Sequence, residues 1–162
     1  MAEPTLVHGF QEHDRQRIVT LLREYEVGIG ISLCFQGFEE ELAGLPGDYG
    51  PPNGALVLAR QAGGEELLGC VAVRPVPQSP GLCEMKRLYV RSAGRGSGLG
   101  RKLALAAMAE ARRLGYRRIC LDTLPTMTAA QVLYRALGFR YTGMAKTNPP
   151  VLLFERDLGA EA

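Results

Sequence analysis

The fold of this chain is decided by the stretch Met85-Lys86-Arg87-Leu88-Tyr89-Val90-Arg91-Ser92-Ala93-Gly94-Arg95-Gly96-Ser97-Gly98-Leu99-Gly100. Its first half is an apolar run that predicts a strand, and the residues from 99 to 114 carry apolar side chains at helical spacing. Between them, glycines at every second position free the backbone for positive φ and for close approach of a ligand. Because the first N–H groups of a helix have no intrahelical partner, this junction predicts an anion-binding site.

Two common nucleotide-binding fingerprints do not fit this loop, although Arg95, Arg101 and Lys102 add charge suited to phosphate. A Walker loop continues with Lys and then Ser or Thr, whereas Gly100 is followed by Arg101. The dinucleotide fingerprint G-x-G-x-x-G fails because Arg101 stands at the place of its last glycine. Glycine spacing alone therefore leaves a plain surface turn open as an alternative.

Outward from the junction, apolar periodicity and turn residues predict a series of strands and helices. Strands are expected over 5–10, 55–60, 67–73, 82–90, 118–123, 139–143 and 151–158. Helices are expected over 39–45 and 99–114, after a cap at Asp14, and after a cap at Thr128 with the stripe Val132, Leu133, Ala136 and Leu137. The order β-α-α-β-β-β-α-β-α-β-β predicts an α/β (α+β) fold, with one mixed, mostly antiparallel sheet of about seven strands and helices on both faces.

Length and composition predict a single domain over residues 1–162, with a core of about 5–158. The chain is 46% hydrophobic and 22% charged with a net charge of +2, and no basic stripe suggests a nucleic-acid partner. No leader pattern and no run of about 20 apolar residues is visible, so we expect a cytoplasmic protein without a membrane partner.

Cysteine and histidine spacing argues against metal, disulfide and hydrolase chemistry. The four cysteines stand far apart without a C-x-x-C pair, so neither a zinc site nor a disulfide framework is expected, and we predict buried, reduced thiols at Cys34, Cys70, Cys83 and Cys120. His8 and His13 lie near no plausible nucleophile, which leaves little material for a serine or cysteine triad.

The run from Met85 to Gly100 resembles the acetyl-CoA signature of the GCN5-related N-acetyltransferases (GNAT), in which a strand precedes [QR]-x-x-G-x-[GA] at the start of a helix. Farther along, Leu133-Tyr134-Arg135-Ala136-Leu137-Gly138-Phe139 is similar to the L-Y-x-x-x-G-F helix ending of the same family. The resemblance covers nearly the whole chain, and two motifs at the proper separation are more specific than one. Many members place an asparagine seven residues before the tyrosine, where this chain has Met127, which puts that one cofactor contact in doubt.

For the cofactor, the resemblance implies that the fourth and fifth strands splay apart and that the pantetheine arm of acetyl-CoA lies in the gap. Backbone groups of Leu88 and Val90, on either side of Tyr89, would pair with this arm. The pyrophosphate would be held by the loop residues Arg95, Gly96, Ser97, Gly98, Leu99, Gly100 and Arg101. No metal is implied.

Acetyl transfer from a thioester needs a neutral amine, a polarised carbonyl and a stabilised thiolate, and we predict Tyr134 as proton donor to the thiolate. Tyr134 stands one position off the stripe of its helix; the alternative is a tyrosine packed at the core edge. Glu84 is the predicted base, because strand alternation places it on one face with Lys86, Leu88 and Val90 and family members carry a glutamate there. Its alternatives are an ion pair with Lys86 or an arginine, and a base acting through a water chain.

The predicted function is acetyl-CoA-dependent N-acetylation of a primary amine of a small molecule, amino acid or peptide, by direct transfer in a ternary complex. The resemblance places the acceptor wall at residues 28–38 and 146–150, and the apolar first segment favours a small amine with an apolar body over a polycation. A homodimer is possible. The alternatives are a non-catalytic acyl-CoA-binding or sensing domain and an interaction domain with an incidental glycine turn.

Overall fold

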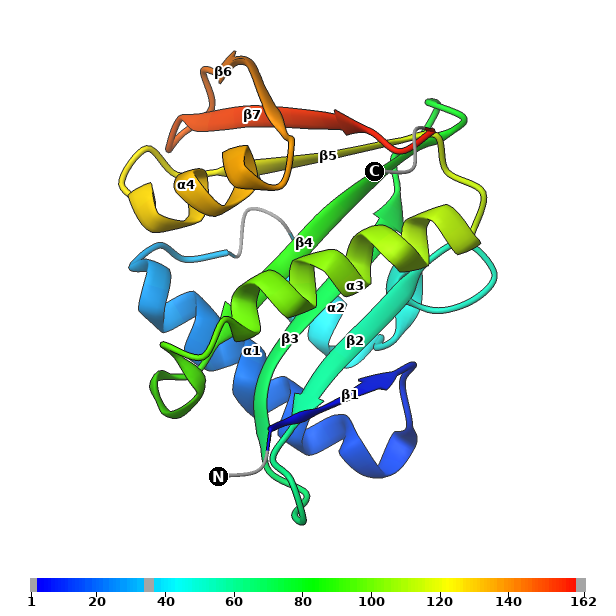
Figure 1. Cartoon of the computed structure of the whole chain (residues 1–162), viewed down its shortest axis with the longest axis vertical. Helices are drawn as coiled ribbons and strands as arrows, with labels where there is room; N and C mark the ends of the chain where they lie inside the picture. Colours follow the sequence, from blue (N-terminus) through cyan, green and yellow to red (C-terminus); the bar gives the residue numbers. More distant parts are fainter. Residues whose placement is uncertain (1–2, 34–36, 160–162) are drawn as a thin grey trace.

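The computed structural model describes residues 3–33 and 37–159, and it confirms the predicted order of strands and helices. A seven-stranded sheet has the strand order β1-β2-β3-β4-β5-β7-β6 (Figure 1). The strands are β1 (Thr5–His8), β2 (Ala55–Arg60), β3 (Leu67–Pro75), β4 (Leu82–Val90), β5 (Arg118–Thr123), β6 (Arg140–Ala145) and β7 (Val151–Asp157). The helices are α1 (Arg15–Ile29), α2 (Phe38–Ala43), α3 (Leu99–Arg113) and α4 (Thr128–Ala136).

The sheet is mixed and open at its middle, as predicted. β4 and β5 run parallel and pair only where Leu82–Glu84 meet Arg118–Cys120. The other neighbouring strands within the described residues pair antiparallel. Beyond this short contact β4 stays with β3 while β5 stays with β7, and Figure 1 shows the two strands diverging. The divergence leaves backbone groups of both strands facing a gap.

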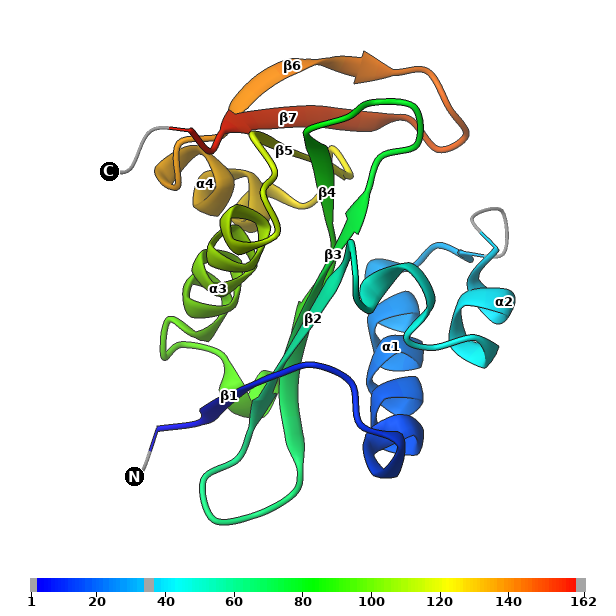
Figure 2. The ribbon, with the colours of Figure 1, turned by 90° about the vertical axis from the view of Figure 1, so that its right-hand side faces the viewer.

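Helices cover both faces of the sheet, α3 and α4 on one side and α1 and α2 on the other (Figure 2). The predicted face of α3 is confirmed, because Leu99, Leu103 and Ala107 are at most 2% exposed in the core on that side. Ile18, Leu21 and Phe38 are fully enclosed in the core on the α1 side. Burial of each large aliphatic or aromatic side chain contributes about 1.5–3 kcal/mol, so both layers hold the sheet firmly.

A bulge in β4 overturns the predicted alternation of its side chains. The register with β3 passes from Ala72 opposite Lys86 to Cys70 opposite Tyr89, and Arg87 takes a positive φ of 61°. The extra residue reverses the pleat, since each strand residue normally points opposite to its neighbour. Leu88 and Val90 therefore pack against the α3 core, while Tyr89 packs with the α1 core. The predicted common face of Glu84 with Leu88 and Val90 was wrong.

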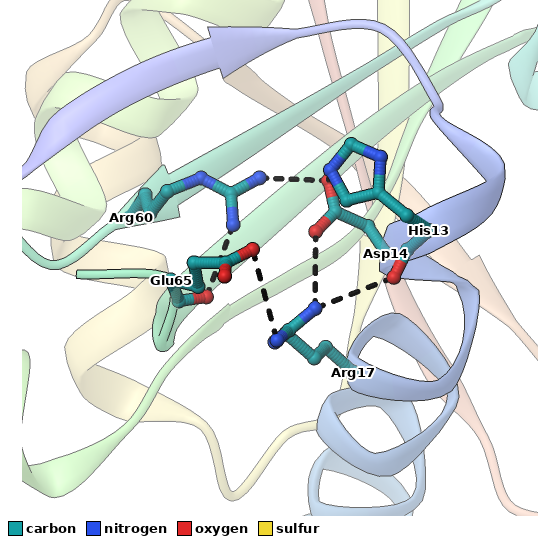
Figure 3. Close-up of polar contacts among 5 residues, drawn as sticks. All are labelled: His13, Asp14, Arg17, Arg60 and Glu65. Carbon is teal, nitrogen blue, oxygen red and sulfur yellow. Dashed lines mark hydrogen bonds and ion pairs between the residues drawn. The ribbon is translucent and has the colours of Figure 1, made fainter.

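Asp14 is the N-cap residue of α1, as predicted, but its side chain makes no capping hydrogen bond. The residue is 1% exposed, and its carboxylate accepts a hydrogen bond of 2.7 Å from Arg60 Nη2 of β2 (Figure 3). Arg60 Nη1 also donates to the main-chain oxygen of Glu65 at 3.0 Å, and Arg17 lies within 3.8 Å of both Asp14 and Glu65. The start of α1 is thereby fixed to the β2–β3 hairpin, because a buried carboxylate requires a charged partner.

Other differences are local. β1 ends at His8 instead of residue 10, and α2 spans Phe38–Ala43 instead of 39–45. The predicted stripe of α4 was partly wrong: Val132 is 69% exposed, whereas Tyr134 and Leu137 are buried. The buried face of α4 is thus rotated relative to the predicted stripe. The ring of Tyr134 packs edge-on against Phe139, with ring centroids 5.9 Å apart. Cys70 and Cys83 are buried free thiols and Cys120 is half-buried; Cys34 lies outside the described residues.

Candidate active site

The glycine loop between β4 and α3 has the open backbone that its spacing predicts. Gly96 and Gly98 have φ of 84° and 74°, a region that side chains with a Cβ rarely adopt, and Gly98 is the N-cap of α3. A Cβ added at either position would meet no atom within 4 Å, so the loop surface is open. The first backbone bond of the helix runs from Lys102 N–H to Gly98 O at 3.0 Å. The N–H groups of Leu99, Gly100 and Arg101 precede this bond and are directed out of the helix start.

Charged side chains around the loop are partly committed within the described chain. Arg95 Nε donates to the main-chain oxygen of Val90 at 2.9 Å, and Ser97 Oγ donates to Gly94 O at 2.8 Å. Lys102 forms an ion pair with Glu3, and Arg101 is exposed. The loop therefore presents backbone N–H groups and arginine charge together, a combination that suits phosphate.

The open edge of β4 continues from the loop toward the gap. Just after β4, Arg91 N–H donates to Leu68 O of β3 at 2.8 Å. Since main-chain groups of successive strand residues point to opposite edges, those of Val90 and Leu88 face the gap and those of Tyr89 face β3. An extended chain could pair with Leu88 and with the N–H of Val90, whose carbonyl is taken by Arg95. The side chain of Tyr89 packs edge-on against Tyr25, with centroids 5.9 Å apart.

A cavity of about 60 Å³ lies where β4 and β5 diverge. Its walls come from both faces of the sheet and from the segment between α1 and α2. It is lined by Tyr25, Ile29, Ile31, Leu33, Met85, Lys86, Arg87, Leu88, Asp122, Thr123, Leu124, Met127, Tyr134, Pro149 and Val151. The two segments expected to form an acceptor wall thus contribute residues, as does Met127.

Tyr134 lines this cavity, and its ring is packed at the edge of the core. It is 7% exposed, and its ring packs against Phe139 and Phe154 at centroid distances of 5.9 and 6.3 Å. Burial raises the pKa of Tyr134, and the nearby Tyr25 and Asp122 raise it further. The phenol is therefore protonated throughout the neutral range, in the form that can donate a proton.

Glu84 is held beside the cavity and is not among its lining residues. Its carboxylate accepts a hydrogen bond of 3.0 Å from Arg74 Nε, and the Glu84 side chain is 14% exposed. It lies on the face of β4 that also carries Lys86. The arginine pair left open from the sequence is present, and the structure does not bring Glu84 into contact with Tyr134.

Lys86, Arg87 and Asp122 are cavity residues that sequence reasoning did not single out as functional. Arg87 is 4% exposed, and its guanidinium donates to both carboxylate oxygens of Glu41 in α2 at 2.8 and 3.0 Å. Burial lowers the pKa of Lys86, an effect that Glu84 partly opposes. Desolvation raises the pKa of Asp122, and Lys86 partly offsets this. No local motif marks Asp122, since its position depends on the divergence of two strands.

The described residues contain no helix long and apolar enough to cross a membrane. Within the same residues, no three His, Cys, Asp or Glu side chains are grouped so that they could hold a metal ion.

Known proteins resemble this chain in sequence. The profile of the Acetyltransferase (GNAT) family matches residues 18–139. An uncharacterised N-acetyltransferase of Schizosaccharomyces pombe is 44% identical over 129 residues, which are 80% of this chain and 78% of the relative. The uncharacterised N-acetyltransferase YjgM of Escherichia coli is 31% identical over 135 residues, 82% of this chain and 80% of its own.

Solved structures agree with the fold. An acetyltransferase of the GNAT family from Staphylococcus aureus superposes with a TM-score of 0.80 at 15% identity, covering 95% of this chain and 99% of that one. A GNAT family acetyltransferase from Elizabethkingia anophelis, solved with acetyl-CoA bound, gives a TM-score of 0.57 at 21% identity over 65% of this chain and 76% of that one. The matched profile covers most of the chain and includes both the glycine loop and Tyr134, so this protein belongs to the GNAT family of acetyltransferases.

Proposed function

We propose that the protein transfers the acetyl group of acetyl-CoA directly to a primary amine. The observation that carries the proposal is the succession of three features from the end of β4 back along its open edge. These are the positive-φ glycines at the start of α3, the open edge of β4, and the cavity that holds Tyr134. The names of the relatives, N-acetyltransferases, and the acetyl-CoA bound to the Elizabethkingia protein support the same donor.

The described residues fit acetyl-CoA. Loop N–H groups with Arg95 and Arg101 would take the pyrophosphate, because hydrogen bonds to charged groups contribute about 1.5–3 kcal/mol each. Leu88 and the N–H of Val90 would pair with the amide groups of the pantetheine arm. The cavity at the end of this edge would receive the thioester, which supplies the activated acetyl group when bound.

In the proposed reaction, the acceptor nitrogen forms a bond to the thioester carbon and the carbon–sulfur bond breaks. Tyr134 donates its phenolic proton to the departing thiolate. Glu84 is the proposed base for the proton that the amine loses. It acts from beside the cavity, through water that connects its carboxylate with the amine. The amine must be neutral to attack, and with a pKa of about 7.7–10.4 it needs such a base near neutral pH.

A thiol-release assay tests the proposed function. The full chain is incubated with acetyl-CoA and one amine at a time from amino acids, aryl-alkylamines, polyamines, aminoglycosides and peptide N-termini, and free CoA is followed together with the mass of the product. We expect thiol release that depends on the amine and an N-acetyl product of the same amount. Acetyl-CoA binding without release on any amine would instead identify an acyl-CoA-sensing domain, and absence of acetyl-CoA binding would exclude both.

A cytoplasmic location and a homodimer stay predictions from the sequence. Sedimentation of the full chain with and without acetyl-CoA measures whether the chain forms a homodimer.

A further inference from the structure

Asp122 lies in β5, just beyond the point where β4 and β5 diverge, on the face of the sheet opposite α3. Its neighbours Leu121 and Thr123 are 2% and 5% exposed, and Leu121 packs in the α3 core. Because side chains alternate along a strand, Asp122 points to the α1 side. Pairing between β4 and β5 has ended at Cys120, so no strand covers Asp122 on its β4 side.

The cavity passes through the sheet at this point. Tyr134 reaches it from α4 on one face, while Asp122 and Tyr25 reach it from the other face. A donor thioester beside Tyr134 would thus meet an acceptor that enters from the side of Asp122. Asp122 is an exposed residue, while desolvation by the surrounding walls raises the pKa of its carboxylate.

The cationic groups near Asp122 are already engaged. Arg87 is bound to Glu41 through two hydrogen bonds, and its side chain is 3% exposed. Arg74 is bound to Glu84, and Lys86, 8% exposed, lies in the field of both Glu84 and Asp122. Within the described residues, the hydrogen bonds and ion pairs of Arg87 and Arg74 involve other carboxylates than Asp122. For a ligand that enters the cavity, the negative charge of Asp122 is therefore more accessible than the positive charges of Arg87 and Lys86.

The remaining wall on this side is apolar. Ile29, Ile31 and Leu33 line the cavity, with the ring of Tyr25 beside them. A second charge on the ligand would lose water against these three aliphatic side chains, which offer it no polar group, and this is costly. The wall therefore suits a ligand with one cationic group and a compact apolar body.

We propose that Asp122 binds the ammonium group of the acceptor, and that the acceptor is a monoamine with a compact apolar body. This rests on the proposed function and deepens it. Asp122 is an acceptor-binding residue here, distinct from the proposed base Glu84 and the proposed acid Tyr134. Desolvation raises the pKa of Asp122, Glu84 raises it further and Lys86 lowers it, and a cation held beside the carboxylate would offset the cost of this desolvation.

The test compares two ligands of the same shape that differ in charge. Phenethylamine and 2-phenylethanol are titrated by calorimetry into the full chain saturated with CoA, in which no transfer can occur. We expect phenethylamine to bind at least about tenfold more tightly than 2-phenylethanol, the order of a partly buried charge pair. Asp122→Asn should reduce this preference to near unity and Asp122→Glu should retain most of it. Asp48→Asn, which changes an exposed carboxylate in the same way, should leave it unchanged.

Three outcomes overturn the inference: equal binding of both ligands to the unmodified chain, an undiminished preference in Asp122→Asn, and tighter binding of spermidine than of phenethylamine. Acetyl-CoA affinity is measured on the same samples. If it is intact while the amine preference is missing, only the role of Asp122 fails. If acetyl-CoA does not bind the unmodified chain, the proposed function fails. Loss of fold in Asp122→Asn is detected by thermal unfolding, and Asp122→Ser then serves as the uncharged variant in which the preference should disappear.

Discussion

Glu84 of β4 and Arg74 of β3 lie directly opposite each other in the antiparallel register and are joined by a hydrogen bond of 3.0 Å from Arg74 Nε to Glu84 Oε1. The pair holds the carboxylate on the α1 face, next to Lys86 and beside the cavity. Arg74 thereby fixes the direction from which Glu84 could take a proton.

Glu84→Gln tests the proposed base. If Glu84 accepts the proton of the amine, the amide should lower kcat/KM by about 10²–10⁴-fold across the neutral range. The measurement is the pH profile of kcat/KM with an amine found active in the thiol-release assay. Glu110→Gln is the matched control, because Glu110 is similarly buried, at 12% exposure, and pairs with Arg113 far along α3. Equal kcat/KM values in Glu84→Gln and Glu110→Gln would place the base elsewhere.

Tyr134→Phe separates the hydroxyl from the ring. Phenylalanine keeps the packing against Phe139 and Phe154, so we expect stability and acetyl-CoA affinity to stay close to those of the unmodified chain. Turnover should fall by about 10²–10⁴-fold, because the thiolate then leaves without its proton donor. Tyr141→Phe, at a 45% exposed tyrosine that also contacts Phe154, should leave turnover unchanged. Equal turnover in both variants would remove Tyr134 as the acid.

Gly98→Val tests the loop against a second glycine of the same conformation. Gly98 and Gly63 have φ of 74° and 75°, and a Cβ at either would meet no atom within 4 Å. Both valines should therefore cost a similar amount of stability, about 1–3 kcal/mol from backbone strain. Only Gly98→Val should abolish acetyl-CoA binding in calorimetry, since Gly63 lies in the β2–β3 turn. Retained affinity in Gly98→Val contradicts the loop assignment.

Asp122→Asn should stabilise the free protein at neutral pH. The pKa of Asp122 is raised in the folded state, so the folded chain binds this proton more tightly than the unfolded chain does. Stability is then lost as the pH rises from the ordinary carboxyl pKa of 3.8 through the raised value. We expect a higher Tm for Asp122→Asn than for the unmodified chain at pH 7, with a difference that disappears below pH 3.8. A lower Tm for the variant at pH 7 would contradict the desolvation of Asp122.

Asp14→Ala should destabilise the fold without touching the site. The change leaves Arg60 without its buried partner (Figure 3), and breaking such a pair costs about 3–5 kcal/mol. Urea unfolding measures the loss. Glu65→Ala removes a neighbouring carboxylate that is 67% exposed, and it should change stability by less than about 1 kcal/mol. Similar losses in the two variants would mean that the Asp14–Arg60 pair does not hold α1 to the hairpin.

Features set by short-range chemistry were predictable from the sequence. The glycine loop and the start of α3 follow from residue spacing within one motif, and the resemblance to the GNAT family implied that Tyr134 lies near the gap. The face of β4 was not predictable, because the inserted Arg87 reverses the pleat and no rule of alternation anticipates an insertion. Asp14 illustrates a competing interaction: its carboxylate could have capped α1, but burial beside Arg60 offers a stronger, charged partner.

Asp122 was missed for a different reason. In the sequence it is a single carboxylate within the strand Arg118–Thr123, which carries no motif. Its significance arises only where β4 leaves β5 after Cys120, at a cavity that Ile31 and Leu33 also line. Such a site depends on contacts between distant parts of the chain, whereas motif reading works within neighbouring residues.

The three-residue contact between β4 and β5 also bears on self-association. Exposed strand edges recruit other chains and promote aggregation. Here the unpaired backbone groups of β4 and β5 face each other across the gap between the two strands. A strand of another chain therefore finds no open sheet edge at this place. The unpaired backbone groups can therefore bind an extended ligand that fits between the two strands, without pairing with strands of other protein molecules.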